Sequence, residues 1–280
     1  METNTAKDNI KTYLPALISL IGDDKDFGWT KINSNFESLL ADRITKANGK
    51  TITVSMTFFD VIVAAKMKNN SAILMLTFFN NLFADLSKRL TDIEKKILWP
   101  TIKNILKSED NRYFEFVGEL AVLNNIITTD IYLLKEVERE LENGKSIDFS
   151  LIEKSNNEVK HVEVYSIHLD PDKVSSENHD IEKFLTHRIN QKIADKSKNI
   201  NTRDFFLVPI LHGRLESLQT YAGYFLKNKL NIAGVTEPLS FMTFSDVEGN
   251  YRHRFGLVSK IFYGDGIEDF ETNKTYIDGQ

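Results

Sequence analysis

The sequence predicts an α/β protein in which an all-helical N-terminal region precedes a domain built on a mixed sheet. Apolar residues recur at helical spacing through residues 1–110. A polar break at 108–111 then separates this region from the rest of the chain. Two β-like runs, 145–154 and 158–169, follow the break, and helical and strand-like segments alternate behind them. We therefore expect two regions, 1–110 and 111–280.

Polar and proline residues bound the helices of the N-terminal region. An apolar stripe of helical period covers 32–44, and a second apolar helix covers 71–90. Thr91 and Glu94 then form a capping box, in which the Thr oxygen accepts a first-turn N–H and the Glu reaches back to the Thr N–H. The helix that begins there should be kinked or divided at Pro100.

Period and turn residues also predict the elements of the C-terminal region. Segments 112–127 and 131–142 have helical period and are separated by the cap-like residues 128–130. Behind the two β-like runs we expect, in order, a polar loop at 170–178, a helix at 181–198, a strand at 205–211, a helix at 215–230 and strands at 239–244 and 255–263.

Composition and charge exclude several classes of function. The 280 residues are 41% hydrophobic and 27% charged, which is typical of a globular protein with a buried core. The absence of cysteine excludes disulfide scaffolds, thiol catalysis and Cys-based metal sites. The net charge of −5 argues against a general polyanion binder, so any basic site must be local. No secretion signal or membrane span is visible, and we expect a cytoplasmic protein without a membrane partner.

The two β-like runs predict a hairpin that gathers acidic side chains. A two-residue turn at 156–157 would place Asp148 opposite Tyr165, with Glu163 as the diagonal neighbour of Asp148. Because side chains alternate with period two, these three residues share one sheet face, and His161 lies further out on it. Two carboxylates converging there can hold a hard divalent cation. Such a cation can activate a water and stabilise a leaving oxygen at a phosphodiester.

At these residues the chain resembles the PD-(D/E)XK nuclease superfamily, which has the restriction-endonuclease-like fold. Asp148 lies in Ser-Ile-Asp-Phe and Glu163 in Val-Glu-Val-Tyr. The order of elements is a helix, a strand with Asp, a strand with Glu, a helix and a strand, over about residues 112–212. The resemblance implies a restriction-endonuclease-like core over 111–280. It also implies an Mg²⁺- or Mn²⁺-dependent endonuclease that cleaves DNA rather than RNA, in bacterial defence or a mobile element.

The resemblance also implies roles for individual residues. Asp148 and Glu163 would bind the metal, and Glu119 in the preceding helix would join them as a third ligand. The chain departs from the family at Tyr165, which stands where the motif has Lys. Members of the superfamily can carry this lysine on the helix after the Glu strand. The helical period places Lys192, our first choice, and Lys196, our second, on the sheet side of that helix, with Tyr165 beside the site.

A second function remains open on the same residues. A Tyr at the motif Lys position is also expected of a catalytically inactive nuclease-like subunit. Such a subunit would bind nucleic acid or a protein partner. Lys192 and Lys196 could instead extend past the apolar stripe of their helix to water. The N-terminal helices would recognise a target or form a homodimer in either case.

Overall fold

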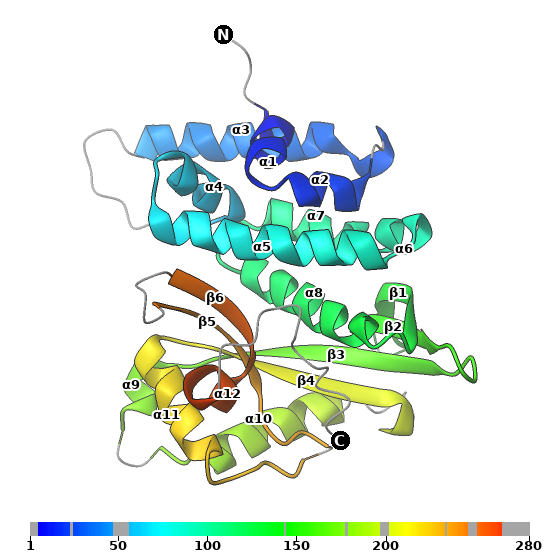
Figure 1. Ribbon diagram of the computed structural model, residues 1–280, viewed down its shortest axis with the longest axis vertical. Helices are drawn as coiled ribbons and strands as arrows, with labels where there is room; N and C mark the ends of the chain where they lie inside the picture. The colour runs from blue at the N-terminus through cyan, green and yellow to red at the C-terminus, as the bar shows by residue number, and fades with distance from the viewer. Residues whose placement is uncertain are drawn as a thin grey trace. The chain divides into compact units, whose positions relative to one another are not determined.

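The computed structural model describes residues 5–22, 25–46, 56–142, 144–176, 179–196, 202–232, 234–245 and 251–264. The chain divides into two compact units, 1–117 and 118–280. The first is helical, and the second carries a mixed sheet of six strands, so the protein is of the α/β class, as predicted (Figure 1). In the described ranges, no helix has both the length and the apolar character that a membrane span requires.

The N-terminal unit is an assembly of helices around aromatic side chains. Phe58, Phe79 and Tyr113 are fully buried, and their rings contact one another. Pro15 and Pro100 each occupy the first turn of a helix, where the missing N–H costs nothing. The helices are α1 (Ala6–Tyr13), α2 (Pro15–Ile21), α3 (Trp29–Lys46), α4 (Phe58–Lys66), α5 (Asn70–Arg89), α6 (Asp92–Ile97) and α7 (Trp99–Lys107), with the 3₁₀ turn η1 (Lys25–Phe27).

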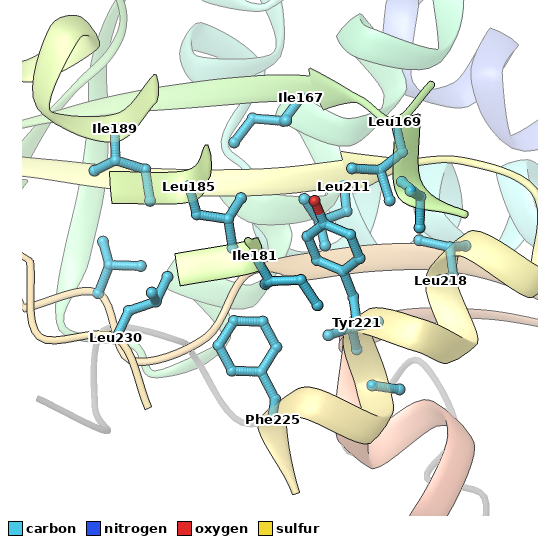
Figure 2. Close-up of a cluster of buried hydrophobic side chains, with 14 of the residues drawn as sticks. Ile167, Leu169, Ile181, Leu185, Ile189, Leu211, Leu218, Tyr221, Phe225 and Leu230 are labelled. Atoms are coloured by element: carbon cyan, nitrogen blue, oxygen red, sulfur yellow. The ribbon is translucent and has the colours of Figure 1, made fainter. Parts of the chain in front are cut away.

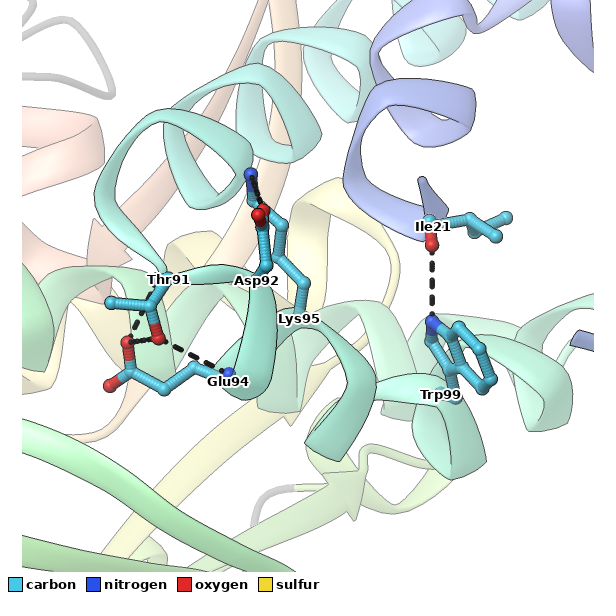
Figure 3. Close-up of polar contacts among 6 residues, drawn as sticks. All are labelled: Ile21, Thr91, Asp92, Glu94, Lys95 and Trp99. Atoms are coloured by element: carbon cyan, nitrogen blue, oxygen red, sulfur yellow. Dashed lines mark hydrogen bonds and ion pairs between the residues drawn. The ribbon is translucent and has the colours of Figure 1, made fainter. Parts of the chain in front are cut away.

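The capping box predicted at Thr91 is present at the start of α6 (Figure 3). The Glu94 backbone N–H donates to Thr91 Oγ1 at 3.3 Å, and the Thr91 N–H donates to Glu94 Oε2 at 2.9 Å. Thr91→Ala should lower the free energy of unfolding by about 1 kcal/mol, because one helix N–H loses its acceptor. Urea denaturation would measure this. Thr91→Ser keeps the oxygen, so an equal loss in that variant would contradict the explanation.

The second unit is organised by a single sheet in the order β1-β2-β3-β4-β5-β6. The pairs β3/β4 and β4/β5 are parallel and the others antiparallel. Its elements, with α8 beginning just before the unit boundary, are α8 (Tyr113–Thr128), β1 (Tyr132–Glu140), β2 (Ser146–Glu153), β3 (Val159–His168), α9 (Pro171–Val174), α10 (Ile181–Lys196), η3 (Thr202–Asp204), β4 (Phe205–His212), α11 (Leu215–Phe225), β5 (Leu239–Ser245), β6 (Tyr251–Leu257) and α12 (Val258–Tyr263).

Helices cover both faces of this sheet. On one face, apolar side chains of α10 and α11 such as Leu185 and Tyr221 meet Ile167 of β3 and Leu211 of β4 (Figure 2). On the other face lies α8, where Gly118 permits a close approach: a Cβ at that position would be only 2.9 Å from Ile210 Cδ1. Because side chains alternate along each strand, every second residue of β2 and β3 faces α10 and the others face α8.

One predicted element has the wrong secondary structure. Most of the segment 131–142, predicted as a helix, forms strand β1 (Tyr132–Glu140) at the sheet edge, paired antiparallel with β2. The Lys, Glu and Arg residues that favour a helix are also those that protect an exposed sheet edge, and pairing with β2 overrides the local preference. A bulge between Leu134 and Glu136 and a positive φ of 51° at Glu138 break the regular period of two.

Smaller differences concern the ends of elements. The strand predicted at 255–263 ends at Leu257, and α12 takes its second half. The predicted loop at 170–178 contains the short helix α9, and the helix predicted at 215–230 ends at Phe225. The last two residues of the helix predicted at 181–198 lie outside the described residues.

The hairpin register differs from the predicted one by two residues. Ser150 pairs with His161 rather than with Glu163, because residues 154–157 form a four-residue connection instead of a two-residue turn. Asn157 has a φ of 60° in this connection, a conformation that Asn tolerates. A shift by two residues preserves the sheet face of every side chain. Asp148, Glu163 and His161 therefore still share a face.

Candidate functional site

Asp148 and Glu163 lie on neighbouring strands where regular pairing ends. β2 and β3 are paired up to Phe149 and Val162, and the two carboxyl residues come one position beyond. There a side-chain hydrogen bond takes the place of a backbone one, since the Val164 N–H donates to Asp148 Oδ2 at 2.7 Å. Glu163 is only 1% exposed, whereas Asp148 is half-buried. The result is a pair of carboxyl groups on the α10 side of the sheet, of which that of Glu163 is the more deeply buried.

Two lysines of α10 reach the same carboxylate oxygen. Lys192 Nζ lies 2.7 Å from Glu163 Oε1, and Lys196 Nζ lies 3.0 Å from it. They are four residues apart, so they occupy successive turns on one face of the helix. Lys196 also donates to the Ser146 carbonyl of β2, which ties the end of α10 to that strand. The Lys192 side chain is 25% exposed and that of Lys196 is 9% exposed, so Lys192 is the more accessible cation.

The charges in this cluster perturb one another. Burial and the neighbouring Glu163 carboxylate raise the pKa of Asp148 to about 7, against the opposing effects of the Val164 N–H and the two lysines. Burial disfavours the charge of Lys192, but the charge and hydrogen bond of Glu163, together with the charges of Asp148 and Tyr165, outweigh burial, and the pKa of Lys192 is raised. Lys192 is therefore a fixed cation near neutral pH, while Asp148 is close to its titration point.

The donor set fits a hard divalent cation in part. Glu163 Oε2 is buried and has no hydrogen-bond partner among the described residues, and burial and the Glu163 charge disfavour the ionised form of the neighbouring Asp148 carboxyl. Both features would be relieved by a cation that takes oxygen ligands. Among the described residues, however, no group of three or more His, Asp or Glu side chains is placed to hold one metal ion. Glu119 on α8 is thus not gathered with Asp148 and Glu163.

Tyr165 lies beside the cluster, on the same face as Glu163. The Lys192 ammonium lies over its ring, 5.2 Å from the centroid, as a cation–π contact. Lys160 has the opposite strand parity and pairs instead with Glu158 and Asp204, at 2.8 Å each. Tyr165 therefore orients the more exposed lysine, and Lys160 takes no part in the cluster.

A second polar group continues the same face toward the sheet edge. Ser150 Oγ lies 3.1 Å from His161 Nδ1, and Arg139 Nη1 lies 3.3 Å from His161 Nε2. Because Arg139 can only donate, Nε2 accepts and Nδ1 carries the proton toward Ser150. Burial and Arg139 both lower the pKa of His161. Arg139 was missed from the sequence because its segment was predicted as a helix; a strand there would have placed it beside the hairpin.

A scan against protein-family models and searches of curated proteins and of solved structures find no match to this chain.

Proposed function

We propose that the protein is a metal-dependent phosphodiester hydrolase that acts on DNA, with a restriction-endonuclease-like core in its second unit. The observation that carries the proposal is the convergence of Asp148, Glu163 and Lys192 just beyond the point where the pairing of β2 with β3 ends. The lysine comes from the helix between β3 and β4 rather than from the strand. Its side chain is 25% exposed, as a group that meets substrate must be in part.

Each residue of the cluster would have a separate role in such a reaction. Asp148 and Glu163 would hold Mg²⁺ or Mn²⁺. When bound, the metal would activate a water and neutralise charge on the leaving oxygen. Lys192 remains protonated, so it acts as a hydrogen-bond donor and positive charge for the water or the phosphate and not as a base. Lys196 fixes Glu163 and the β2 backbone in place.

A second candidate function is a catalytically inactive subunit with the same architecture. The observation that favours it is that both lysines contact one Glu163 oxygen. The two ammonium groups therefore neutralise that carboxylate without a metal. In that case the cluster would be a structural ion-pair network. The two functions differ in their response to metal, because only a metal site is stabilised by Mg²⁺ through linkage.

Cleavage of a nucleic-acid panel tests the proposal directly. Duplex DNA, single-stranded DNA and RNA would be incubated with the wild-type protein in Mg²⁺ or Mn²⁺. The variant Asp148→Asn and the exposed control Asp130→Asn would be assayed in the same way. We expect DNA cleavage by wild type and by the control, and its loss in Asp148→Asn. We also expect Mg²⁺ to raise the thermal midpoint of wild type but not that of Asp148→Asn. A wild type that neither cuts nor responds to metal would favour the inactive subunit.

A further inference from the structure

Three aromatic rings in contact with one another lie beneath several lysines of the N-terminal unit. Phe27 is fully buried and contacts Trp29 and Trp99, with ring centroids 5.0 Å and 5.5 Å away. Gly28, at a φ of 82°, turns the chain between η1 and α3, so that Phe27 points inward while Trp29 stays half-buried. Trp99, at the start of α7, is fixed by its Nε1–H, which donates to the Ile21 carbonyl at 3.3 Å (Figure 3).

Lysines lie over these rings and beside them. Lys103 lies 5.2 Å from the Phe27 centroid and 5.4 Å from that of Trp99, so its ammonium is held in place by two cation–π contacts. Lys107 follows one turn later on α7, and Lys31 comes from α3, which packs against α7. We call Lys31, Lys103 and Lys107 the lysine surface.

The lysine surface gathers positive charge from two helices. In the part of the chain that the structure describes, none of its three lysines forms an ion pair with a carboxylate. Burial, together with the charges of Lys31 and Lys103, lowers the pKa of Lys107. Three like charges from two helices are thus brought together with no carboxylate partner among the described residues, although the whole chain has a net charge of −5. Such an arrangement costs free energy that an anionic ligand would recover.

We propose that the lysine surface binds the phosphate backbone of a nucleic acid. The choice of nucleic acid among polyanions rests on the proposed function, because a DNA hydrolase must hold its substrate. A membrane fits less well, since Phe27 is buried and both indoles are covered by ammonium groups or engaged in hydrogen bonds. Positively charged groups that contact phosphates release condensed counterions, so binding through this surface should weaken with salt.

The chain's only two tryptophans, Trp29 and Trp99, both lie at this surface, and their emission reports its occupancy. Full-length protein in EDTA would be titrated with a duplex, with a single strand of the same sequence and with polyglutamate. Tryptophan emission and the anisotropy of labelled DNA would be followed at several salt concentrations. The triple variant K31E/K103E/K107E and the single variant Lys103→Ala would be compared with K66E/K88E/R89E, which changes the net charge equally through α4 and α5.

We expect DNA to change the tryptophan emission of wild type and of the control. In the triple variant the emission change should vanish and the affinity fall at least 10-fold. The slope of log affinity against log salt should decrease by about 0.9 for each phosphate contact removed from a duplex. Lys103→Ala, which introduces no new charge, should show a smaller change in the same direction. Circular dichroism would establish that each variant is folded.

Three outcomes would overturn the inference. One is tryptophan emission that does not respond to DNA in a wild type that binds it, and another is an equal loss of affinity in the control variant. The third is an equal response to polyglutamate, which would assign the surface to an acidic protein.

The experiment tests the surface separately from the proposed function, because neither readout requires cleavage. Binding through this surface without any cleavage would refute only the hydrolase, whereas cleavage with an unchanged KM in the triple variant would refute only the surface.

Discussion

Asp148→Asn is expected to raise the free energy of unfolding at pH 8 by roughly 2 kcal/mol, although it removes a residue that we place at the centre of the site. The Asp148 carboxyl has its pKa raised from 3.8 to about 7 by burial and by Glu163. Each unit of pKa shift corresponds to about 1.4 kcal/mol, so ionising this group in the folded protein costs up to about 4 kcal/mol. Rearrangement of Lys192 and Lys196 around the charge should reduce that cost, and Asn keeps an acceptor for the Val164 N–H.

The pH dependence has a definite sign. Between pH 4 and pH 7 the folded protein binds the Asp148 proton more tightly than the unfolded chain does. Wild-type stability from this group should therefore fall as the pH rises through that window, and it should level off above pH 7. The stabilising effect of Asp148→Asn should be largest at pH 8 and disappear near pH 4. Urea denaturation at closely spaced pH values, in EDTA, would measure both.

Asp130→Asn provides a matched control. Asp130 is exposed, and its pKa is lowered by the hydrogen bond and charge of Lys154. Its φ of 60° suits Asn, so the substitution introduces no backbone strain. It should not stabilise the protein at any pH. If Asp148→Asn instead destabilised the protein at pH 8, the carboxylate would be well compensated as it stands, and the site would resemble a structural ion-pair network.

The sequence predicted the faces of this site better than its register or its full set of strands. Alternation with period two places Asp148 and Glu163 on one face whatever even shift the hairpin takes, and helical period places Lys192 and Lys196 on the inner side of α10. The turn could not be predicted in the same way, because 154–157 and 156–157 are both compatible with paired Asn residues. Strand β1 was missed since its charged residues favour a helix locally, and only its pairing with β2 makes it a strand.

The α10 lysines should separate into two roles when each is replaced by Met, which keeps the length and apolar contacts of the side chain. Lys192→Met should lower the rate of DNA cleavage by about 10²–10³-fold, the range for removing one donor that stabilises developing charge. Its effect on stability should be small, because Lys196 still neutralises Glu163. Lys196→Met should lower the free energy of unfolding more, by about 1–2 kcal/mol, since it removes the more buried partner of Glu163 and the donor to the Ser146 carbonyl, although Lys192 still neutralises Glu163.

This division follows from position alone, since both ammonium groups contact the same Glu163 oxygen. Lys192 is 25% exposed and borders Tyr165, which leaves it open to a phosphate of the proposed substrate, whereas Lys196 is 9% exposed and donates a second hydrogen bond to the Ser146 carbonyl of β2. Single-turnover cleavage and urea denaturation would be measured for both variants and for Lys183→Met, an exposed lysine of the same helix. A catalytic loss in Lys196→Met without loss of stability, together with normal cleavage by Lys192→Met, would reverse the two roles. Normal cleavage by both variants would show that neither α10 lysine takes part in the chemistry. Tyr165, which stands at the motif position of the lysine, would then be the next residue to test.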